Sequence, residues 1–205
     1  MHPREAERAQ RERMAVFYER ARSPVMQDIE RRVCGCDYGA SSWTTRAEAN
    51  VLSELLGLKP GDHLLDVGAG SGWPGLYMAS QRGCDVTLVD LPLAGLLIAS
   101  ERSLLECNGG RCSVTVADAA QLPFGLATFD ALSHSDLLCC LRDKQAALAS
   151  CRQVLRVSGR MALTVISLAS GLTTLQKARA IEAGPLFVEA PMAYPELLRA
   201  VSYSH

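Results

Sequence analysis

The sequence lacks any apolar run that approaches the roughly 18 residues of a membrane-spanning helix, and neither sign of charge is in clear excess. Its 205 residues carry 21 lysine and arginine side chains against 22 aspartate and glutamate side chains, for a net charge of −1. The first 33 residues hold eight arginines and six acidic side chains, which excludes the apolar segment of a signal peptide and the acid-poor composition of a transit peptide. We therefore expect a cytoplasmic protein that binds no membrane and no nucleic acid, and whose partner is a small molecule.

Cysteine motifs are also missing, although the sequence contains eight cysteines. None forms a C-x-x-C pair, and they are scattered through apolar segments, where a free thiol behaves as a small buried side chain. We expect structural thiols and no metal site; the pair Cys34-x-Cys36 leaves a redox or metal role open. No internal repeat or low-complexity segment interrupts the chain, and its length and 48% hydrophobic content favour one compact unit.

Three amphipathic helices are predicted before residue 60. The first carries the aromatic pair Phe17 and Tyr18, which we expect to pack in the core. The second begins at Ser23-Pro24, an N-cap followed by a first-turn proline. The third begins after Thr45, which forms a capping box with Glu48.

Short apolar runs then alternate with helical stretches. The runs are rich in β-branched residues and nearly unbroken, which is typical of parallel strands covered on both faces, and their spacing leaves room for a crossover helix each time. We therefore predict an α/β fold with a Rossmann-like, doubly wound, mainly parallel sheet and helices on both faces. The predicted strands are 63–67, 86–90, 113–118, 129–133 and 160–166. The predicted connecting helices lie in 75–83, 93–110 and 144–156, the second ending on a cap at residues 108–110.

The segment LLDVGAGSGWPG, residues 64–75, places four glycines behind the first strand and ahead of the first crossover helix. An open α/β sheet binds its ligand at this point. Glycine lets the chain turn sharply and lets a ligand approach the backbone, so we expect free N–H groups here that face an anionic or polar ligand group. A dinucleotide fingerprint starting at Gly68 would need a small residue where this chain has Trp73, which disfavours a nicotinamide oxidoreductase.

Read from Asp66 as D-x-G-x-G-x-G, the loop resembles the cofactor motif of the class I S-adenosylmethionine-dependent methyltransferases. The resemblance covers residues 61 to about 166, over half of the chain, and rests on several motifs in order. It implies that the chain binds S-adenosylmethionine as cofactor and transfers its methyl group by in-line displacement. The general type is similar to the quinone-biosynthesis and natural-product methyltransferases.

The resemblance also implies roles for single residues. Asp90, at the end of the second strand, would accept both ribose hydroxyls, an arrangement suited to a carboxylate, with Leu91 against the adenine. Asp118 would receive the adenine amino group beside the backbone N–H of Ala119. His134 would lie near the transferring methyl group as the candidate catalytic base. The expected cofactor-binding set is Asp66, Gly68, Ala69, Gly70, Gly72, Asp90, Leu91, Asp118, Ala119 and Ser133.

These residues also have structural interpretations, which stay open. Asp90 and Asp118 could each cap a strand end or a turn, and His134 could be a hydrogen-bonded core residue. Asp136 is expected to be the N-cap of the next helix. Tyr38 and Trp43 could wall the pocket as part of a lid or pack in the core.

The resemblance implies two parts of the chain. Residues 1–45 are expected to form an N-terminal helical lid, and residues 46–205 the Rossmann-like domain, in which 168–205 cover the acceptor. Family members continue past the segment YPELLRA (194–200) into two strands that form an antiparallel hairpin, and VSYSH is too short for it. We therefore expect the hairpin to be missing, with the chain truncated and the fifth strand exposed as an edge. Such an edge would favour a homodimer.

The methyl acceptor is not named by the sequence. Family members that methylate nucleic-acid bases carry an Asn/Asp-Pro-Pro-aromatic segment after the fourth strand, and those that modify arginine present paired glutamates there. The segment SHSDLL (133–138) has neither. A small-molecule acceptor attacked at oxygen, nitrogen or carbon is therefore favoured, and a non-catalytic cofactor-binding or scaffold protein is the alternative function.

Overall fold

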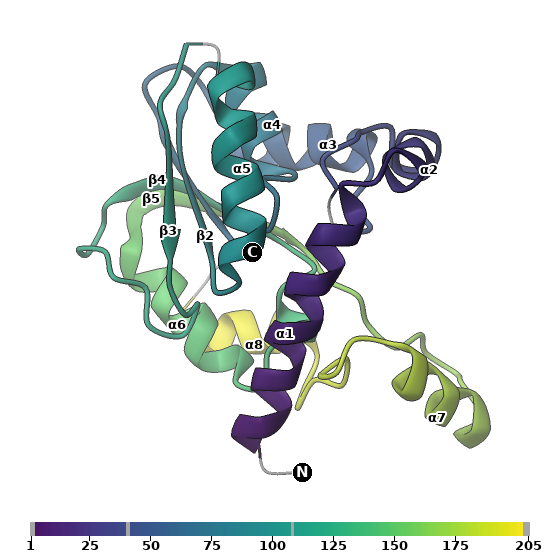
Figure 1. Cartoon of the computed structure of the whole chain (residues 1–205). Coiled ribbons are helices and arrows are strands. Elements are labelled where there is room, and N and C mark those ends of the chain that lie inside the picture. Colours follow the sequence, from purple (N-terminus) through teal and green to yellow (C-terminus); the bar gives the residue numbers. More distant parts are fainter. Residues whose placement is uncertain (1–2, 40–41, 108, 203–205) are drawn as a thin grey trace.

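A five-stranded parallel sheet forms the centre of the molecule (Figure 1). The computed structural model describes residues 3–39, 42–107 and 109–202. All neighbouring strands pair in parallel, which confirms the predicted sheet, and the strand order β3-β2-β1-β4-β5 reverses between β1 and β4. This reversal places a topological switch point at the carboxyl ends of β1 and β4. The strands are β1 (His63–Val67), β2 (Asp85–Asp90), β3 (Cys112–Val116), β4 (Phe129–Ser135) and β5 (Leu155–Thr164).

Helices cover both faces of the sheet, as predicted. Helices α3, α4 and α5 pack on one face, and α6 packs on the other. The described helices are α1 (Pro3–Ala21), α2 (Pro24–Cys34), α3 (Arg46–Leu56), α4 (Gly75–Arg82), α5 (Leu93–Glu106), the 3-10 turn η1 (Leu138–Cys140), α6 (Lys144–Val154), α7 (Thr174–Ala183) and α8 (Tyr194–Ala200).

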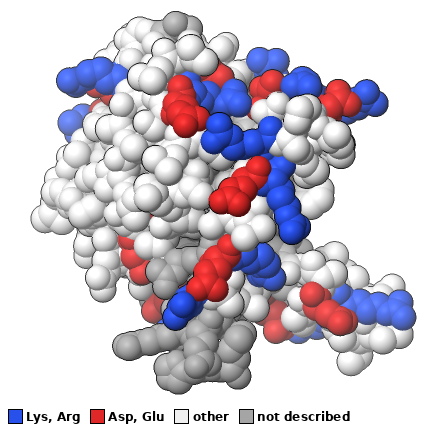
Figure 2. Space-filling model, viewed as in Figure 1, with Lys and Arg blue, Asp and Glu red and all other residues white. Residues whose placement is uncertain are grey.

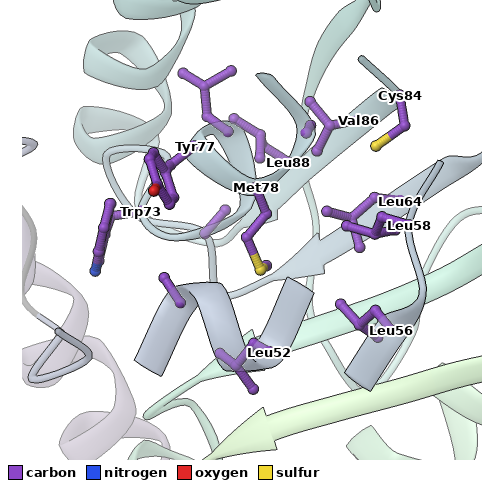
Figure 3. Packing of buried hydrophobic residues seen from close by; sticks show 14 of the residues in the cluster. Leu52, Leu56, Leu58, Leu64, Trp73, Tyr77, Met78, Cys84, Val86 and Leu88 are labelled. Atoms are coloured by element: carbon purple, nitrogen blue, oxygen red, sulfur yellow. The ribbon is translucent and has the colours of Figure 1, made fainter. Parts of the chain in front are cut away.

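The larger core cluster lies between the sheet and helices α3 to α5 (Figure 3). Alternate strand residues share a face, so Leu64 of β1 and Leu88 of β2 both point to this side, where they join Leu52 of α3 and Met78 of α4. Each fully buried leucine contributes roughly 1.5–3 kcal/mol through its transfer from water. The opposite face is covered by a second cluster, which includes Leu65, Val67, Val89, Leu132 and Val154.

The connection between β3 and β4 contains no helix. Residues 117–128 form turns and bends without a helix, and the third strand ends at Val116 rather than at residue 118. The segment contains Pro123 and Gly125, which favour turns over a continuous helix. The three predicted connecting helices did not include this connection, so only the end of the third strand differs from the prediction.

Two other boundaries also differ. Strand β5 begins at Leu155, directly after α6, and its pairing with β4 jumps from Phe129↔Leu155 to Ala131↔Arg160. Residues 156–159 therefore bulge from the ladder ahead of the predicted start at 160. Helix α5 ends at Glu106 with Cys107 as its cap, so the cap predicted at residues 108–110 was wrong; residue 108 lies outside the described residues.

The N-terminal helices start as predicted. The Ser23 hydroxyl accepts the Met26 N–H, and Thr45 and Glu48 form a reciprocal capping box at the start of α3. Helix α1 lies beside α5 and crosses in front of the lower end of the sheet in Figure 1. Among its described side chains, arginines and acids alternate along the face shown in Figure 2, so these side chains form no basic stripe there.

The segment after β5 forms helices. Helix α7 projects away from the rest of the molecule, and none of its residues is buried (Figure 1). Within residues 165–202 no strand follows β5, which is an edge of the described sheet. No described helix combines the length and the apolar content needed to cross a membrane.

Candidate functional site

The loop between β1 and α4 is held onto the sheet by its own hydrogen bonds. Gly68, Gly70 and Gly72 have φ angles of +75°, +52° and +99°, which glycine adopts without steric cost. The N–H groups of Gly68 and Ala69 donate to the Val89 carbonyl oxygen at 2.7 and 3.0 Å, and the Gly72 N–H donates to the Ala69 carbonyl oxygen at 2.8 Å. The expectation that these N–H groups are free was therefore wrong, because they fasten the loop to itself and to β2.

Asp66 lies beneath this loop. Its Oδ2 accepts the N–H of Gly75, the first residue of α4, at 3.1 Å, and its Oδ1 accepts the Ser133 hydroxyl hydrogen at 2.7 Å. Burial raises the pKa of Asp66 to about 7. A Cβ at position 75 would overlap the Asp66 carboxylate, so glycine is required there. Asp66 and Ser133 together tie β1 to β4 and fix the start of α4.

Asp90 ends β2, and its carboxylate faces the loop. Oδ2 accepts the Gly70 N–H at 2.7 Å, and Oδ1 accepts the Leu91 N–H at 2.7 Å. Burial raises the pKa of Asp90 to about 6, against the lowering effect of these two hydrogen bonds. A carboxylate offers about four lone-pair positions, so each oxygen can accept one further hydrogen bond.

Tyr18 of α1 closes over Gly70. Its hydroxyl oxygen lies 2.6 Å from the position of a Cβ on Gly70, and its ring lies 3.0 Å from the position of a Cβ on Gly95 of α5. A Cβ on Gly95 would also lie 2.9 Å from the Gly70 carbonyl oxygen. Two glycines therefore allow a loop, a helix and an aromatic ring to meet at one point. Tyr18 is buried as expected, but against this loop, whereas Phe17 is partly exposed.

Asp136 fastens the segment before α3 to the end of β4. With a φ of +55°, it accepts the Trp43 N–H at 2.9 Å and the Ser42 hydroxyl hydrogen at 3.1 Å. The expected N-cap role of Asp136 was wrong, because Leu137 precedes η1 without a side-chain cap and Asp143 caps α6.

Hydroxyl groups complete this attachment. The Thr44 hydroxyl lies within hydrogen-bond distance of the hydroxyls of Ser135 and Thr164, which lie 2.8 Å from each other at the ends of β4 and β5. The Trp73 indole N–H donates to the Thr44 carbonyl oxygen at 2.8 Å. We call residues 42–45 the lid loop; these contacts link it to β4, β5 and the glycine loop.

Tyr38 and Trp43 lie in different surroundings. Tyr38 is buried, its hydroxyl donates to the Glu106 carboxylate, and the Arg102 guanidinium lies 4.2 Å from its ring centroid. Its ring centroid lies 5.1 Å from that of Trp73. Trp43 is 72% exposed, so it is the member of the pair that can contact another molecule.

His134 is enclosed within β4. Neither ring nitrogen has a hydrogen-bond partner among the described residues, and burial lowers the pKa of His134 to about 4. The ring is therefore neutral at pH 7. Because Ser133 contacts Asp66 and alternate strand residues face opposite sides, the His134 side chain points to the α6 side of the sheet.

Asp118 lies two residues after β3 and is exposed. Its Oδ1 accepts the Ala120 N–H at 2.9 Å, and its carbonyl oxygen accepts the Gln121 N–H at 2.9 Å. The carboxylate therefore caps a turn, which was one of its two interpretations. Ala119 is buried against the α6-side cluster.

All eight cysteines are free thiols. The Cys36 thiol donates to Glu30 Oε1 at 3.3 Å, and burial raises its pKa, while Cys34 is partly exposed. Among the described residues, no three histidine, cysteine or acidic side chains gather as metal ligands would.

Two residues that shape the crevice were not predicted. Gly95 lies inside a helix, where glycine costs about 1 kcal/mol relative to alanine and so signals a close approach. Leu137 packs on Gly68, with its Cδ1 2.8 Å from the position of a Cβ there. Nothing in the local sequence indicates the contact of Leu137, because it depends on how β4 sits beside β1.

The glycine loop follows β1 at the switch point of this doubly wound sheet, and the acid at the end of the neighbouring strand β2 faces the loop. These features define an α/β protein of the nucleoside-cofactor-binding class. Residues 65–163 match the family model of a methyltransferase domain, which agrees with the resemblance of the sequence motifs to the class I S-adenosylmethionine-dependent methyltransferases. The family model thus supports the family indicated by the sequence motifs, whose methyl donor is S-adenosylmethionine.

Relatives share part of their length with this chain. Phosphoethanolamine N-methyltransferase 1 of Zea mays is 29% identical over 154 residues, which are 74% of this chain and 30% of the relative. The 27-O-demethylrifamycin SV methyltransferase of Amycolatopsis mediterranei is 32% identical over 112 residues, which are 55% of this chain and 41% of the relative. The chain therefore spans less than half the length of either protein.

A solved structure shows the same fold. Phosphoethanolamine N-methyltransferase 2 of Haemonchus contortus, in complex with phosphomonomethylethanolamine and S-adenosylhomocysteine, matches with a TM-score of 0.73 at 20% identity. The match covers 92% of this chain and 44% of that one.

Proposed function

We propose that this chain binds S-adenosylmethionine at the switch point and transfers its methyl group to a small-molecule acceptor. The observation that carries the proposal is the Asp90 carboxylate, which is fixed by Gly70 and Leu91 with one further acceptor position on each oxygen. Two acceptor oxygens held in this way suit the two hydroxyls of a ribose diol. The match of residues 65–163 to the methyltransferase family model supports the choice of cofactor.

The groups around Asp90 fit that cofactor. Tyr18 lies over Gly70 in the space that a Cβ would fill, and Leu91 is partly exposed beside the carboxylate as an apolar surface for a purine. We propose that the exposed Asp118 carboxylate and the Ala119 N–H receive the adenine edge. This is compatible with the turn cap, because the bond from Ala120 uses one of several acceptor positions.

The other predicted residues would act through the loop. Gly68, Ala69 and Gly72 set the path of its backbone, and their N–H groups already bond within the protein. We propose Asp66 and Ser133 as positioning residues, because they hold the start of α4 beneath the loop.

The bound cofactor supplies a methyl group activated by the sulfonium charge. The chain has to orient the acceptor in line and exclude water, and orientation alone can lower a barrier by roughly 7–11 kcal/mol. For an acceptor that loses a proton, we propose His134 as the group that takes it, because its ring is neutral and both ring nitrogens lack partners among the described residues. A positioned base adds about 10²- to 10⁴-fold.

We propose residues 1–45 as a lid over the crevice. The side-chain amide of Gln10 donates to the Cys140 carbonyl oxygen at 3.3 Å, and two turns further along α1 Tyr18 lies on Gly70. Helix α1 therefore spans from η1 to the glycine loop. The lid loop would wall the same opening on the side of β4 and β5, with Trp43 facing outward.

We propose residues 168–205 as the acceptor-side cover of the domain 46–205. The Phe187 N–H donates to the Cys139 carbonyl oxygen at 3.1 Å, and the buried Lys144 ammonium donates to the Phe187 carbonyl oxygen at 2.7 Å. These bonds fix the segment around Phe187 beside η1.

The acceptor is proposed to be a small molecule. The two curated relatives are named for phosphoethanolamine and for 27-O-demethylrifamycin SV, both small molecules, which supports this class. Oxygen, nitrogen and carbon are the candidate attacking atoms, and the products of the assay identify which one is methylated.

Two measurements test the proposal. Calorimetric titration with S-adenosylhomocysteine should show binding that Asp90→Ala abolishes or weakens and that Asp85→Ala, at the opposite end of β2, leaves unchanged. Release of S-adenosylhomocysteine should then be followed across a panel of phenols, alcohols and amines. Cofactor binding without release of S-adenosylhomocysteine in the presence of any acceptor would indicate the non-catalytic cofactor-binding alternative. Absence of cofactor binding would overturn the site.

A further inference from the structure

A cavity of about 460 Å³ lies outside the proposed cofactor crevice. It is walled by the segment between α2 and α3, the first residue of α3, the outer side of α4 and the end of α5. None of the residues proposed to hold the cofactor lines it. Its volume falls within the range of cavities that hold small ligands.

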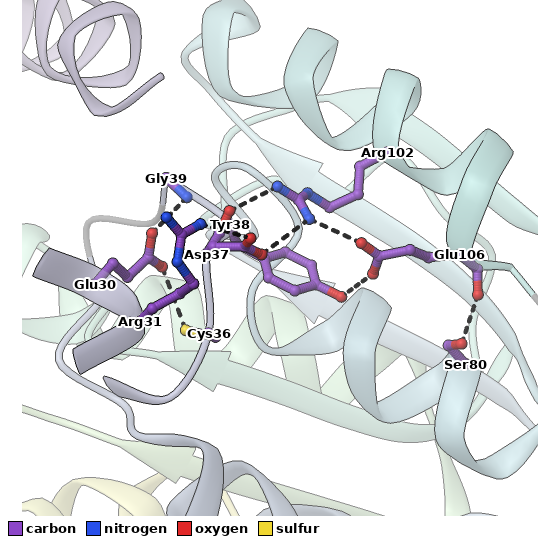
Figure 4. Close-up of polar contacts among 9 residues, drawn as sticks. All are labelled: Glu30, Arg31, Cys36, Asp37, Tyr38, Gly39, Ser80, Arg102 and Glu106. Atoms are coloured by element: carbon purple, nitrogen blue, oxygen red, sulfur yellow. Dashed lines mark hydrogen bonds and ion pairs between the residues drawn. The ribbon is translucent and has the colours of Figure 1, made fainter. Parts of the chain in front are cut away.

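The acidic groups of this cavity are already paired (Figure 4). The Asp37 carboxylate lies 3.1 Å from the Arg31 guanidinium. The Glu106 carboxylate lies 2.8 Å from the Arg102 guanidinium and also accepts the Tyr38 hydroxyl hydrogen. The Ser80 hydroxyl donates to the Glu106 carbonyl oxygen. These acids therefore leave little net negative charge to attract a cation.

Arg46 differs from the other cations of the cavity. Its guanidinium carbon lies 5.2 Å from the Tyr77 ring centroid, and its Nε donates to the Tyr77 hydroxyl at 3.4 Å. The Tyr77 hydroxyl in turn donates to Asn50 Oδ1 at 2.9 Å, which fixes the ring. Arg46 has no acidic partner among the described residues. A guanidinium presents parallel N–H groups that match a carboxylate.

Apolar groups accompany this charge. Leu105 lines the cavity and is 85% exposed. Three aromatic rings form a row along the wall, with centroids of Tyr38 and Trp73 5.1 Å apart and those of Trp73 and Tyr77 5.2 Å apart. The cavity therefore joins the Arg46 cation to an apolar wall.

We propose that this cavity is a second ligand site, which binds a small carboxylate with an apolar or aromatic body. The carboxylate pairs with Arg46, and the body lies against Leu105 and the edge of the aromatic row. Trp73 lines the cavity and directly follows Gly72 of the glycine loop, so the occupant contacts a residue next to the proposed cofactor site.

Tryptophan fluorescence tests this site independently of methyl transfer. The chain has two tryptophans, so Trp43→Phe leaves Trp73 as the reporter. Titration of this variant with phenylacetate should change the emission saturably, whereas phenylacetamide, its neutral analogue, should leave the emission unchanged. Arg46→Gln should weaken phenylacetate binding at least about tenfold, Arg46→Lys should retain part of it, and Arg179→Gln, on the projecting helix α7, should retain all of it.

The outcomes separate clearly once unfolding curves show that the variants are folded. Saturable, charge-dependent binding that requires Arg46 supports the site. An equal response to phenylacetamide, an unchanged affinity in Arg46→Gln, or no saturation within the solubility of phenylacetate would each overturn it.

Discussion

The hydroxyl oxygen of Tyr18 lies 2.6 Å from the position that a Cβ would take on Gly70. Helix α1 can therefore rest on the glycine loop only because residue 70 has no side chain. The same glycine donates its N–H to Asp90. One backbone position thus links the lid helix to the acid proposed to hold the ribose.

Gly70→Ala should disturb this link. The φ of +52° alone costs an alanine about 1–2 kcal/mol, and its methyl group would also push Tyr18 away. We expect S-adenosylhomocysteine to bind at least about tenfold more weakly, which is about 1.4 kcal/mol, as measured by calorimetry. Undiminished affinity would contradict the assignment of this loop.

Gly171→Ala is the matched control for backbone strain. Gly171 has a φ of +77° with nothing within 4 Å of its Cβ position, so its substitution adds strain without a clash. It should lower the free energy of unfolding and leave cofactor affinity unchanged. In a Tyr18→Ala background, Gly70→Ala should cost less than in the wild type, because the clash with the hydroxyl is gone.

Cofactor affinity should depend on the ionisation of Asp90. Its pKa of about 6 means that the carboxylate is protonated, and a poorer acceptor, below that pH. We expect S-adenosylhomocysteine affinity to fall about tenfold for each pH unit below 6 and to level off above pH 7. Asp90→Asn should bind about 1.5–3 kcal/mol more weakly at pH 7.5 and lose this pH dependence. Asp85→Asn should keep it; a slope that persists in Asp90→Asn would reassign Asp90 as a structural cap.

The sequence was sufficient to predict elements whose signals are local. The caps at Ser23 and Thr45 depend on residues within one turn, and the parallel sheet follows from buried runs between amphipathic helices. The acid at position 90 could be placed at the glycine loop because carboxyl ends of parallel strands share an edge of the sheet.

Contacts between distant segments could not be predicted in this way. The approach of Tyr18 to Gly70 joins residues 52 positions apart, and the bond from Trp43 to Asp136 spans 93 positions. Asp136 has the composition of an N-cap, but its left-handed φ and its distant partner give it another role. The hydrogen bonds that the loop N–H groups of Gly68 and Ala69 donate also depend on a distant residue, because their acceptor is the carbonyl oxygen of Val89 in the neighbouring strand.

Folding stability should report on Asp66. Its pKa is raised from 3.8 to about 7 in the folded chain, so the neutral acid favours folding below about pH 4, and this contribution is lost as the pH rises to about 7. Within this window the free energy of unfolding should fall by about 1.4 kcal/mol for each pH unit. Asp66→Asn cannot ionise, so its stability relative to the wild type should rise across this window in denaturant unfolding at several pH values. A constant difference between the two proteins would contradict the buried neutral acid.

His134 provides the last test, because a proton acceptor and a core residue respond differently to substitution. If His134 takes a proton from the acceptor, His134→Asn should lower kcat by about 10²- to 10⁴-fold with little change in KM or in S-adenosylhomocysteine affinity. Since burial lowers its pKa to about 4, the wild-type kcat should stay level from pH 8 down to about pH 5. His63→Asn is the matched control, because His63 lies at the opposite end of the sheet, at the start of β1 against Phe129 and Thr87. A lower free energy of unfolding with an unchanged kcat for the folded His134→Asn protein would make His134 a core residue, and the methyl transfer would then depend on the placement of the acceptor alone.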